Sequence, residues 1–396
     1  MITAIFIILL LATILFDYLA CRHIARRTSS KILARIIISF CAITDSLPLV
    51  VVALMSGLFF GDNSPRLSDA AMWTTTLYCL TTLPRLALYV GLSIFRNRTA
   101  ARISGAVLAT AVFALLLVSI TNTRTNLVVK SLRLQYDNLP PAFDGYRIAL
   151  ISDLHIGAML DAPKYTRHIV DTLNSLRADM VVFGGDLVNI RHSELSAPIE
   201  HILSAIRATD GVVAVLGNHD TGIYIKDTLA TPRPENTERV CASMRRMGWR
   251  LLRDSTIYVH RNNDSIAVTG LDFPDSLLVL RHKFSFDESV YDLSRVYADI
   301  PASTFDITVS HMPQLWHEIM AVGRGDLVLS GHVHAAQMKA EWHSLRLSPA
   351  MFMYKEWSGL YEADGRRLYI NDGIGNVGFY MRIGARPEIT VLELCN

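Results

Sequence analysis

The chain divides into a strongly apolar first part and a second part in which short apolar runs alternate with amphipathic segments. Up to about residue 125, the apolar residues form four long segments, at roughly 2–20, 33–60, 70–95 and 103–120. Each approaches or exceeds the ~20 residues that a helix needs to cross a bilayer. The pattern predicts four transmembrane helices, and the alternative is one helical bundle buried within a soluble protein.

The positive charges between these segments predict the topology. Arginines and lysines gather after the first segment and after the third, whereas the connection between the second and third contains only Arg66. Short loops rich in Lys and Arg stay on the cytoplasmic side of a membrane. We therefore expect a multi-pass protein of the cytoplasmic membrane, with its large C-terminal domain on the extracytoplasmic (periplasmic or extracellular) side.

Two ionisable residues fall well inside predicted spans. Asp45 lies in the second segment and Arg85 in the third, each about ten residues from the inner end of its span, at ~15 Å depth. A charged side chain at such a depth is costly and is usually partnered. The sequence predicts an ion pair between Asp45 and Arg85. In the alternative, Arg85 extends to the interface alone and Asp45 lines a kink.

Beyond residue 121 the pattern changes to short β-branched runs that alternate with helical periodicity. We expect strands at 127–136, 146–152, 180–184, 212–216, 265–270, 305–310 and 326–330, and helices at 162–177, 195–208, 236–248 and 313–322. Such alternation is typical of an α/β architecture, and the tail, with strand-like stretches at 367–370 and 389–394, looks β-rich. The predicted organisation is a membrane domain over 1–121, a connector with the first strand over 122–145, and an α/β domain over 146–396.

Composition adds a charge asymmetry to this division. Residues 1–125 contain eleven Lys and Arg against four Asp, and the remainder contains 27 basic and 32 acidic residues. The mildly acidic second part gives no sign of a nucleic-acid surface. Of the five cysteines, only Cys241 and Cys395 lie beyond the apolar part, too few for a disulfide framework.

Five polar stretches directly follow predicted strands. They are Ser-Asp-Leu-His at 152–155, Gly-Gly-Asp at 184–186, Gly-Asn-His-Asp at 217–220, Ser-His at 310–311 and Gly-His-Val-His at 331–334. Strand ends are where an α/β fold gathers its site residues. Each stretch alone has an ordinary alternative, either a turn or a buried structural histidine. Together their donors are too many for one metal ion and about right for two.

The residue types indicate which metals and which chemistry to expect. Carboxylate and amide oxygens mixed with imidazoles, and no thiolate, favour Mn, Fe, Zn or Co over Ca or a structural zinc. Asp186 follows two glycines that permit a sharp turn, so its carboxylate can bridge two cations. Two metals that share a carboxylate are the usual means of phosphate-ester hydrolysis. The sequence thus predicts a binuclear metallophosphoesterase.

In this order the motifs resemble the calcineurin-like metallophosphoesterases over roughly residues 146–395. The lead-in Leu-Pro-Pro-Ala-Phe-Asp-Gly-Tyr-Arg-Ile at 139–148 and the ending Gly373-Ile-Gly, Arg382 and Pro387-Glu388-Ile389 look like the membrane-anchored bacterial branch. The resemblance implies a four-layer α/β/β/α sandwich with two divalent metal ions at the strand ends. It implies Asp153, His155, Asp186 and His334 as ligands of one metal, and Asp186, Asn218, His311 and His332 as ligands of the other.

The same resemblance implies His219 as the catalytic histidine and Asp220 as the residue that orients it. A metal-bridging hydroxide would attack phosphorus while His219 protonates the departing alkoxide. The chain departs from the branch at Ala335 and Ala336, where two glycines often precede the residue equivalent to Gln337. This departure concerns the pocket wall and leaves the ligands unchanged.

The expected function is a membrane-anchored phosphoesterase that acts on phosphodiesters, phosphomonoesters or lipid-linked phosphates. Its expected partners are the phosphate-ester substrate and the lipid bilayer, without nucleic acid. One alternative is a nucleotide–lipid pyrophosphatase of envelope lipid synthesis, and another is a non-catalytic membrane protein that senses metal or phosphate. An apolar, aromatic stretch from Trp342 to Trp357 could face lipid, contact a hydrophobic leaving group or belong to the core.

Overall fold

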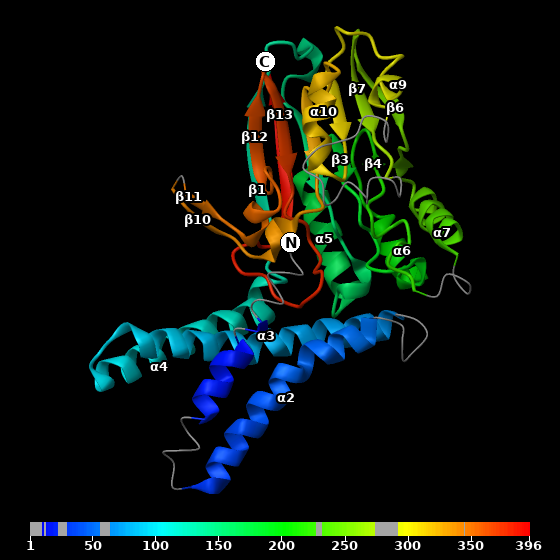
Figure 1. Cartoon of the computed structure of the whole chain (residues 1–396). Helices are drawn as coiled ribbons and strands as arrows, with labels where there is room; N and C mark the ends of the chain where they lie inside the picture. Colours follow the sequence, from blue (N-terminus) through cyan, green and yellow to red (C-terminus); the bar gives the residue numbers. More distant parts are fainter. Residues whose placement is uncertain are drawn as a thin grey trace. The chain divides into compact units, whose positions relative to one another are not determined.

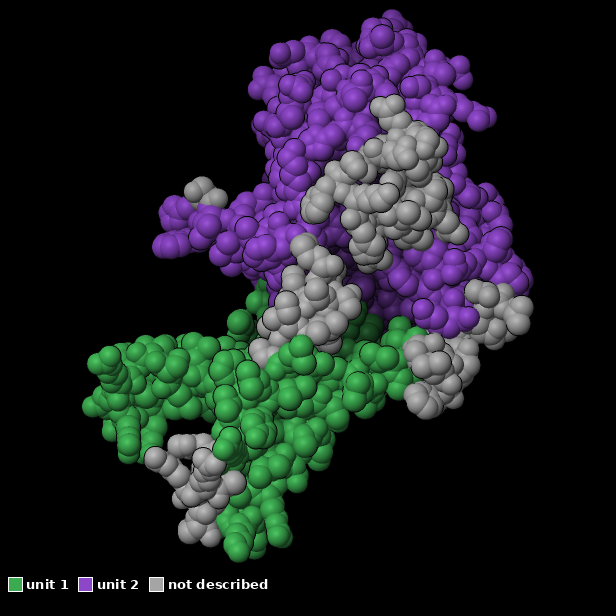
Figure 2. Space-filling view, in the orientation of Figure 1, with its two compact units in different colours: residues 1–123, 378–383 green, residues 124–377, 384–396 purple. Residues whose placement is uncertain are grey.

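The computed structural model describes residues 10–11, 13–22, 30–55, 64–226, 232–273, 292–343 and 345–396. The chain forms two compact units, coloured separately in Figure 2. The first comprises residues 1–123 together with 378–383, and the second comprises 124–377 together with 384–396. The polypeptide therefore leaves the second unit after Val377, contributes a short segment to the first, and returns at Gly384. The sequence-predicted boundaries at 121 and 145 remain predictions.

In the described part of the first unit there are three long apolar helices (Figure 1): α2 (Lys31–Met55), α3 (Pro65–Ile94) and α4 (Arg98–Val118), the last extended by the π-helical turn η1 (Ser119–Thr123). Their length and hydropathy suit a membrane span, and they correspond to the second, third and fourth predicted spans. Residues 13–22 are also helical, but part of the first predicted span lies outside the described residues. A Cβ built on Gly91 would lie 2.5 Å from Gly105 Cα, so glycine is what allows α3 and α4 to pack this closely.

The predicted ion pair between Asp45 and Arg85 is confirmed. Arg85 Nη2 lies 2.9 Å from Asp45 Oδ1, and Arg85 Nη1 lies 2.6 Å from Asp17 Oδ2. Tyr89 Oη donates to the other oxygen of Asp17 at 2.5 Å. The side chain of Asp17 is only 3% exposed and that of Arg85 12%. Arg85 thus joins three helical segments and does not extend to the interface alone. The sequence does not predict its second partner, the carboxylate of Asp17.

Replacing Asp45 with asparagine should destabilise the first unit, because the substitution removes one of the two charges that neutralise Arg85. Polar contacts between membrane helices typically contribute about 1 kcal/mol, so the melting temperature in detergent should fall by a few degrees. Arg102→Gln, at an exposed position of α4, is the matched control and should melt as the wild type does. Equal melting temperatures for Asp45→Asn and wild type would contradict a stabilising role for the pair.

The described residues of the second unit form two six-stranded sheets and a separate hairpin. The first sheet has the order β1-β14-β2-β3-β4-β5, and the second has the order β12-β13-β9-β8-β7-β6. The first-sheet strands are β1 (Val128–Gln135), β2 (Tyr146–Ile151), β3 (Met180–Phe183), β4 (Val212–Ala214), β5 (Arg250–Leu251) and β14 (Glu388–Cys395). The second-sheet strands are β6 (Ser255–Arg261), β7 (Asp264–Gly270), β8 (Asp306–Val309), β9 (Leu327–Ser330), β12 (Gly359–Ala363) and β13 (Arg366–Ile370).

These sheets confirm the predicted mixed α/β class and the strands expected from the sequence. The two tail strands separate, because β13 pairs with β9 in the second sheet whereas β14 inserts between β1 and β2 in the first. The helices are α5 (Ala162–Leu176), α6 (Ala197–Leu203), α7 (Arg233–Arg246), α9 (Leu293–Val296) and α10 (Trp316–Ala321). The strands β5, β6 and β12 and the hairpin of β10 (Ala340–Trp342) and β11 (Leu345–Leu347) were not predicted.

Alternate residues of the strands enter two different cores. In β2, Ile148 and Leu150 join a core made of residues from both sheets, whereas Ala149 and Ile151 join a core that includes residues of α5, α6 and α7. Strands buried on both faces read as continuous apolar runs, which is why the sequence identified them. This burial fixes the strand ends, and with them the polar residues that follow.

Candidate metal centre

The predicted site residues stand at the carboxyl ends of five parallel strands in the two sheets. Asp153 and His155 follow β2, Asp186 follows β3, Asn218 follows β4, His311 follows β8, and His332 and His334 follow β9. Five of them have a left-handed backbone: Asp153 (φ 56°), His155 (43°), Asp186 (60°), His332 (72°) and His334 (52°). This conformation costs about 1–2 kcal/mol per residue and persists only where the surroundings enforce it, typically at functional sites.

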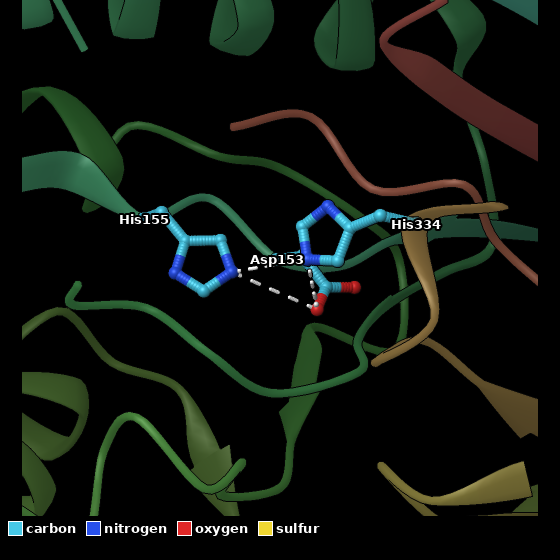
Figure 3. Close-up of side chains that lie close together, drawn as sticks. All are labelled: Asp153, His155 and His334. Carbon is cyan, nitrogen blue, oxygen red and sulfur yellow. Dashed lines mark hydrogen bonds and ion pairs between the residues drawn. The ribbon is translucent and has the colours of Figure 1, made fainter. Parts of the chain in front are cut away.

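One group of donors forms where the turns after β2 and β9 meet (Figure 3). His334 Nε2 lies 3.1 Å from Asp153 Oδ1 and 3.1 Å from His155 Nε2. His155 Nε2 is also 3.7 Å from Asp186 Oδ2. Asp153 and His155 are fully buried. Three side chains therefore present metal-binding atoms to one point, with Asp186 at its edge.

A second group forms on the other side of Asp186. Asp186 Oδ2 lies 3.1 Å from His311 Nε2, and Asn218 Oδ1 lies 3.2 Å from the same nitrogen. His332 Nδ1 lies 2.9 Å from Asn218 Oδ1. Asp186 thus lies between the two groups: it is close to His155 and His219 on one side and to His311 and His332 on the other. All seven residues expected to hold metal come together, and this set of carboxylate, amide and imidazole donors fits divalent cations.

Neighbouring groups orient these donors. His311 Nδ1 is 2.7 Å from the Gly184 carbonyl, which accepts its proton and leaves Nε2 facing Asp186. Asn218 Nδ2 donates to Tyr224 Oη at 2.9 Å, so its Oδ1 faces the site. Gly185 has φ +99°, and a Cβ there would lie 2.6 Å from His311 Nδ1, so only glycine fits. Such supporting hydrogen bonds fix the tautomer and orientation of metal ligands.

The electrostatics of the site differ from one imidazole to the next. Burial and the nearby His219 hold the pKa of His155 well below its usual value, so this ring is neutral and ready to bind a cation. Burial would also lower the pKa of His311, but the Asp186 carboxylate outweighs it and raises the pKa to about 9. The imidazole of His334 offsets the effect of burial on Asp153 and lowers the pKa of that carboxyl. Metal binding should therefore release a proton, mainly from His311.

His219 is buried beside the donors, but its expected partner is different. We expected Asp220 to orient this ring; instead His219 Nδ1 lies 2.5 Å from the backbone carbonyl of Asn189. The Asp220 carboxylate accepts backbone N–H bonds of 2.8–3.1 Å from Asp186, Leu187, Val188 and Gly217. Asp220 thus joins the turns after β3 and β4, while a backbone carbonyl orients the histidine. Each oxygen of Asp220 accepts two N–H groups, so the lone pairs of the carboxylate are already used and none is left to accept a hydrogen bond from the His219 ring.

Glu194 is a supporting residue that the sequence did not reveal. Its carboxylate accepts the backbone N–H groups of Asn189 (2.5 Å), Ile190 (2.8 Å) and Arg191 (3.2 Å). It therefore fixes the segment whose Asn189 carbonyl contacts His219. Burial raises the pKa of Glu194 to about 6, although these backbone donors act in the opposite direction. A lone glutamate in a polar loop gives no sequence signal for such a role.

The raised pKa of Glu194 predicts a pH dependence of stability. A carboxyl that binds its proton more tightly in the folded than in the unfolded protein stabilises the fold below the unfolded pKa, and this contribution is lost as pH rises through the folded pKa. The pKa of Glu194 rises from its ordinary value of 4.5 to about 6 in the folded protein. As pH rises through this window, Glu194 should therefore lower the free energy of unfolding by at most about 2 kcal/mol. Melting curves of wild type and Glu194→Gln with chelator present should differ in slope across this window. Parallel slopes would refute the assignment.

Comparisons with known proteins agree with this geometry. The calcineurin-like phosphoesterase family model matches residues 146–336. A transmembrane protein with metallophosphoesterase domain from Danio rerio is 29% identical over 67% of this chain and 57% of its own length. The UDP-2,3-diacylglucosamine pyrophosphatase LpxG of Chlamydia trachomatis is 25% identical over 65% of this chain and 86% of its own. The uncharacterized metallophosphoesterase YkuE of Bacillus subtilis is 24% identical over 65% of this chain and 81% of its own length.

This chain spans less than two thirds of the length of the Danio rerio relative. The matched region begins at the first residue of β2 and extends past His334, so it contains the whole set of donors described above. The motifs, the converging strand ends and the family match coincide on the same residues. Residues 146–336 of this chain form a calcineurin-like phosphoesterase domain.

Proposed function

We propose that this chain is a membrane-anchored, binuclear metal-dependent phosphoesterase. The observation that carries the proposal is the position of Asp186 between two groups of donors, each completed by imidazoles. Asp153, His155, Asp186 and His334 would hold one divalent ion, and Asp186, Asn218, His311 and His332 the other. When bound, such ions supply Lewis acidity that activates water and neutralises phosphate charge. Manganese, iron, zinc and cobalt all suit these donors.

His219 would act as the general acid towards the leaving-group oxygen. Its Nδ1 proton is committed to the Asn189 carbonyl, which leaves Nε2 to face a substrate. Burial lowers the pKa of His219, so the ring is largely neutral in the free site. An anionic phosphate ester beside the ring would raise this pKa again, because an opposite charge favours the protonated form. Substrate binding would thus favour uptake of a proton from solvent by His219, which the ring would then donate to the leaving-group oxygen.

A lipid-linked phosphate is the substrate class that the hairpin of β10 and β11 supports. The register pairs Trp342 with Leu345 and Ala340 with Leu347, so these four apolar residues share one face. Trp342 is 73% exposed and Leu345 52%, and the hairpin projects from the body of the second unit (Figure 1). Exposed apolar faces of this kind mark contact with lipid or a protein partner.

The hairpin is also close in sequence and structure to the donors. Its first strand begins six residues after His334, and Ser348 Oγ, just after its second strand, donates to the Ala335 carbonyl at 2.8 Å. The ring of Tyr354, just beyond it, lies 6.1 Å from that of His332. A lipid held by the hairpin would therefore present its phosphate near the proposed metals.

A second candidate is a nucleotide–lipid pyrophosphatase, which the resemblance to the chlamydial LpxG favours. A nucleotide–lipid substrate of envelope synthesis is cytosolic, whereas the charge distribution predicts an extracytoplasmic domain. A topology reporter fused to the C-terminus separates the two candidates. An outward C-terminus excludes the pyrophosphatase, and an inward one excludes the extracytoplasmic enzyme.

Four transmembrane helices and a four-layer α/β/β/α sandwich complete the proposed architecture. Three described helices of suitable length, and the helical residues 13–22, support the first. The core shared by both sheets, and the helices in contact with the outer residues of β2, support the second.

The purified full-length protein, loaded with Mn²⁺ in detergent, should hydrolyse bis-p-nitrophenyl phosphate. A chelator should abolish turnover, and Mn²⁺ added back should restore it, because the proposed reaction needs the bound ions to activate water and to neutralise the charge of the phosphate. Two bound ions per chain by elemental analysis are the matching stoichiometry. A protein that binds two ions without turning over any phosphate ester would instead be a sensor.

A further inference from the structure

A cavity of about 320 Å³ lies beside the proposed metal centre, and all of its lining residues belong to the second unit. Three segments form its walls: Arg124 and Thr125 at the start of the unit, residues 158–168 around the beginning of α5, and the loop 374–376 after β13. None of these residues belongs to the metal-binding set. The cavity is within the size range of small-ligand sites.

Both main walls are bonded to the segment that carries Asp153 and His155. The Gly375 N–H donates to the Asp153 carbonyl at 2.7 Å, and the Ala158 N–H donates to the His155 carbonyl at 2.8 Å. A group bound in the cavity would therefore lie next to a phosphate held by the metal ligands. The cavity has the position of a subsite for another part of the same substrate.

The charges of the cavity favour an anion. Two cationic side chains, Lys164 and Arg124, line it against a single carboxylate, Asp161. That carboxylate accepts the backbone N–H of Lys164 at 3.4 Å as the N-cap of α5. Among the residues that the structure describes, no carboxylate pairs with the Lys164 ammonium. The N-terminus of the 15-residue α5 adds a partial positive charge on the same side.

The side chain of Asn376 offers a hydrogen-bond acceptor to a ligand in the cavity. This side chain lines the cavity and is 6% exposed. Its Oδ1 accepts no hydrogen bond from any residue in the described ranges. A buried acceptor without a donor is rare in proteins unless water or a ligand supplies one. An ionised phosphate has no proton to give, whereas a hydroxyl group beside it does.

We propose that this cavity binds a phosphorylated polyol, with its phosphate on Lys164 and Arg124 and a hydroxyl donated to Asn376 Oδ1. The bound group would be a second anionic part of the substrate; this link to catalysis rests on the proposed function, but the binding does not. Two sources share this chemistry: the headgroup of a phospholipid and a soluble polyol phosphate. Arg124 is the first residue after the candidate span Arg98–Thr123, which makes lipid a natural source.

Calorimetric titration of the full-length protein in non-ionic detergent, with chelator present throughout, tests the proposal. Removing metal excludes binding at the metal centre and makes the result independent of any phosphoesterase activity. The probes are sn-glycerol 3-phosphate, methyl phosphate, which lacks an alcohol hydroxyl, and dihexanoyl phosphatidylglycerol. Dihexanoyl phosphatidylcholine, whose zwitterionic headgroup has no net charge and no hydroxyl, is the lipid control. The variants are Lys164→Ala and Asn376→Ala, and Arg167→Ala, at an exposed position of α5 outside the cavity, is the matched control.

We expect saturable binding of sn-glycerol 3-phosphate that weakens about tenfold in Lys164→Ala and is unchanged in Arg167→Ala. Asn376→Ala should remove the preference for sn-glycerol 3-phosphate over methyl phosphate while retaining the phosphate affinity. Tighter binding of dihexanoyl phosphatidylglycerol than of sn-glycerol 3-phosphate identifies a lipid headgroup as the source, and the reverse order identifies a soluble phosphate. Absence of saturable binding by every anionic probe, or equal affinities in wild type and Lys164→Ala, would overturn the proposal.

Discussion

Asp186→Asn is expected to abolish phosphoester hydrolysis and to reduce the bound metal. The carboxylate is 2% exposed and lies 3.1 Å from His311 Nε2 and 3.7 Å from His155 Nε2. Asparagine keeps the shape of the side chain but removes the charge that both groups of donors share. Because a bridging carboxylate sets the separation of two cations and offsets their repulsion, its loss should lower kcat by more than about 10³-fold.

Metal content and activity should be measured on the same preparation of Asp186→Asn. Asp306→Asn is the matched control, since Asp306 is another buried carboxylate whose described hydrogen bonds go to Thr269, Thr308 and the Gly325 N–H, away from the donors of the site. We expect Asp306→Asn to keep both ions and its turnover, even where its melting temperature falls. An Asp186→Asn protein with two ions and wild-type kcat would remove the basis of the proposed mechanism.

His219→Ala is expected to lower kcat about 10²–10⁴-fold towards alkyl phosphate esters, which is the usual contribution of a general acid. The loss should be much smaller for p-nitrophenyl esters, because p-nitrophenolate is a stable anion that needs no proton to depart. Metal content should not change, since His219 is outside the proposed ligand set. This dependence on the leaving group separates proton donation from a general loss of structure.

The comparison of an alkyl and a p-nitrophenyl ester is best made with His201→Ala as control. His201 is exposed on α6, so its removal tests only the loss of an imidazole from the surface. If His219→Ala lowered kcat equally for both esters, the ring would position the substrate and would not protonate it. Loss of one metal ion in His219→Ala would mean instead that His219 is a ligand, in line with its place beside His155 and Asp186.

The sequence predicted those parts of the fold whose signals are local. Strands such as β2 and β8 are buried on both faces, so their residues form continuous apolar runs that are visible in the sequence. The short strands of the β10–β11 hairpin carry no such run, because only one face is apolar and the three-residue strands are exposed. The place of β14 between β1 and β2 depends on pairing between distant segments, which no local pattern encodes.

The same distinction holds at the site. The donors were predictable because carboxylates and imidazoles after strands have a recognisable chemistry. The partner of His219 was not, because the Asn189 carbonyl is a backbone group that every residue possesses. Asp17 was missed as a second partner of Arg85 because the pairing joins helices far apart in sequence.

The position of β14 has a consequence for biosynthesis. Among the described strands, β1, which ends at Gln135, has β14 as its one neighbour, and β14 begins at Glu388. A ribosome working at 5–20 residues per second would add the intervening stretch of about 250 residues in roughly 10–50 s. Throughout that interval β2, the strand that leads into Asp153, would have β3 on one side and an open edge on the other. The nascent domain would thus carry two unpaired strand edges, one on β1 and one on β2, and the first sheet could not be completed before β14 has been made.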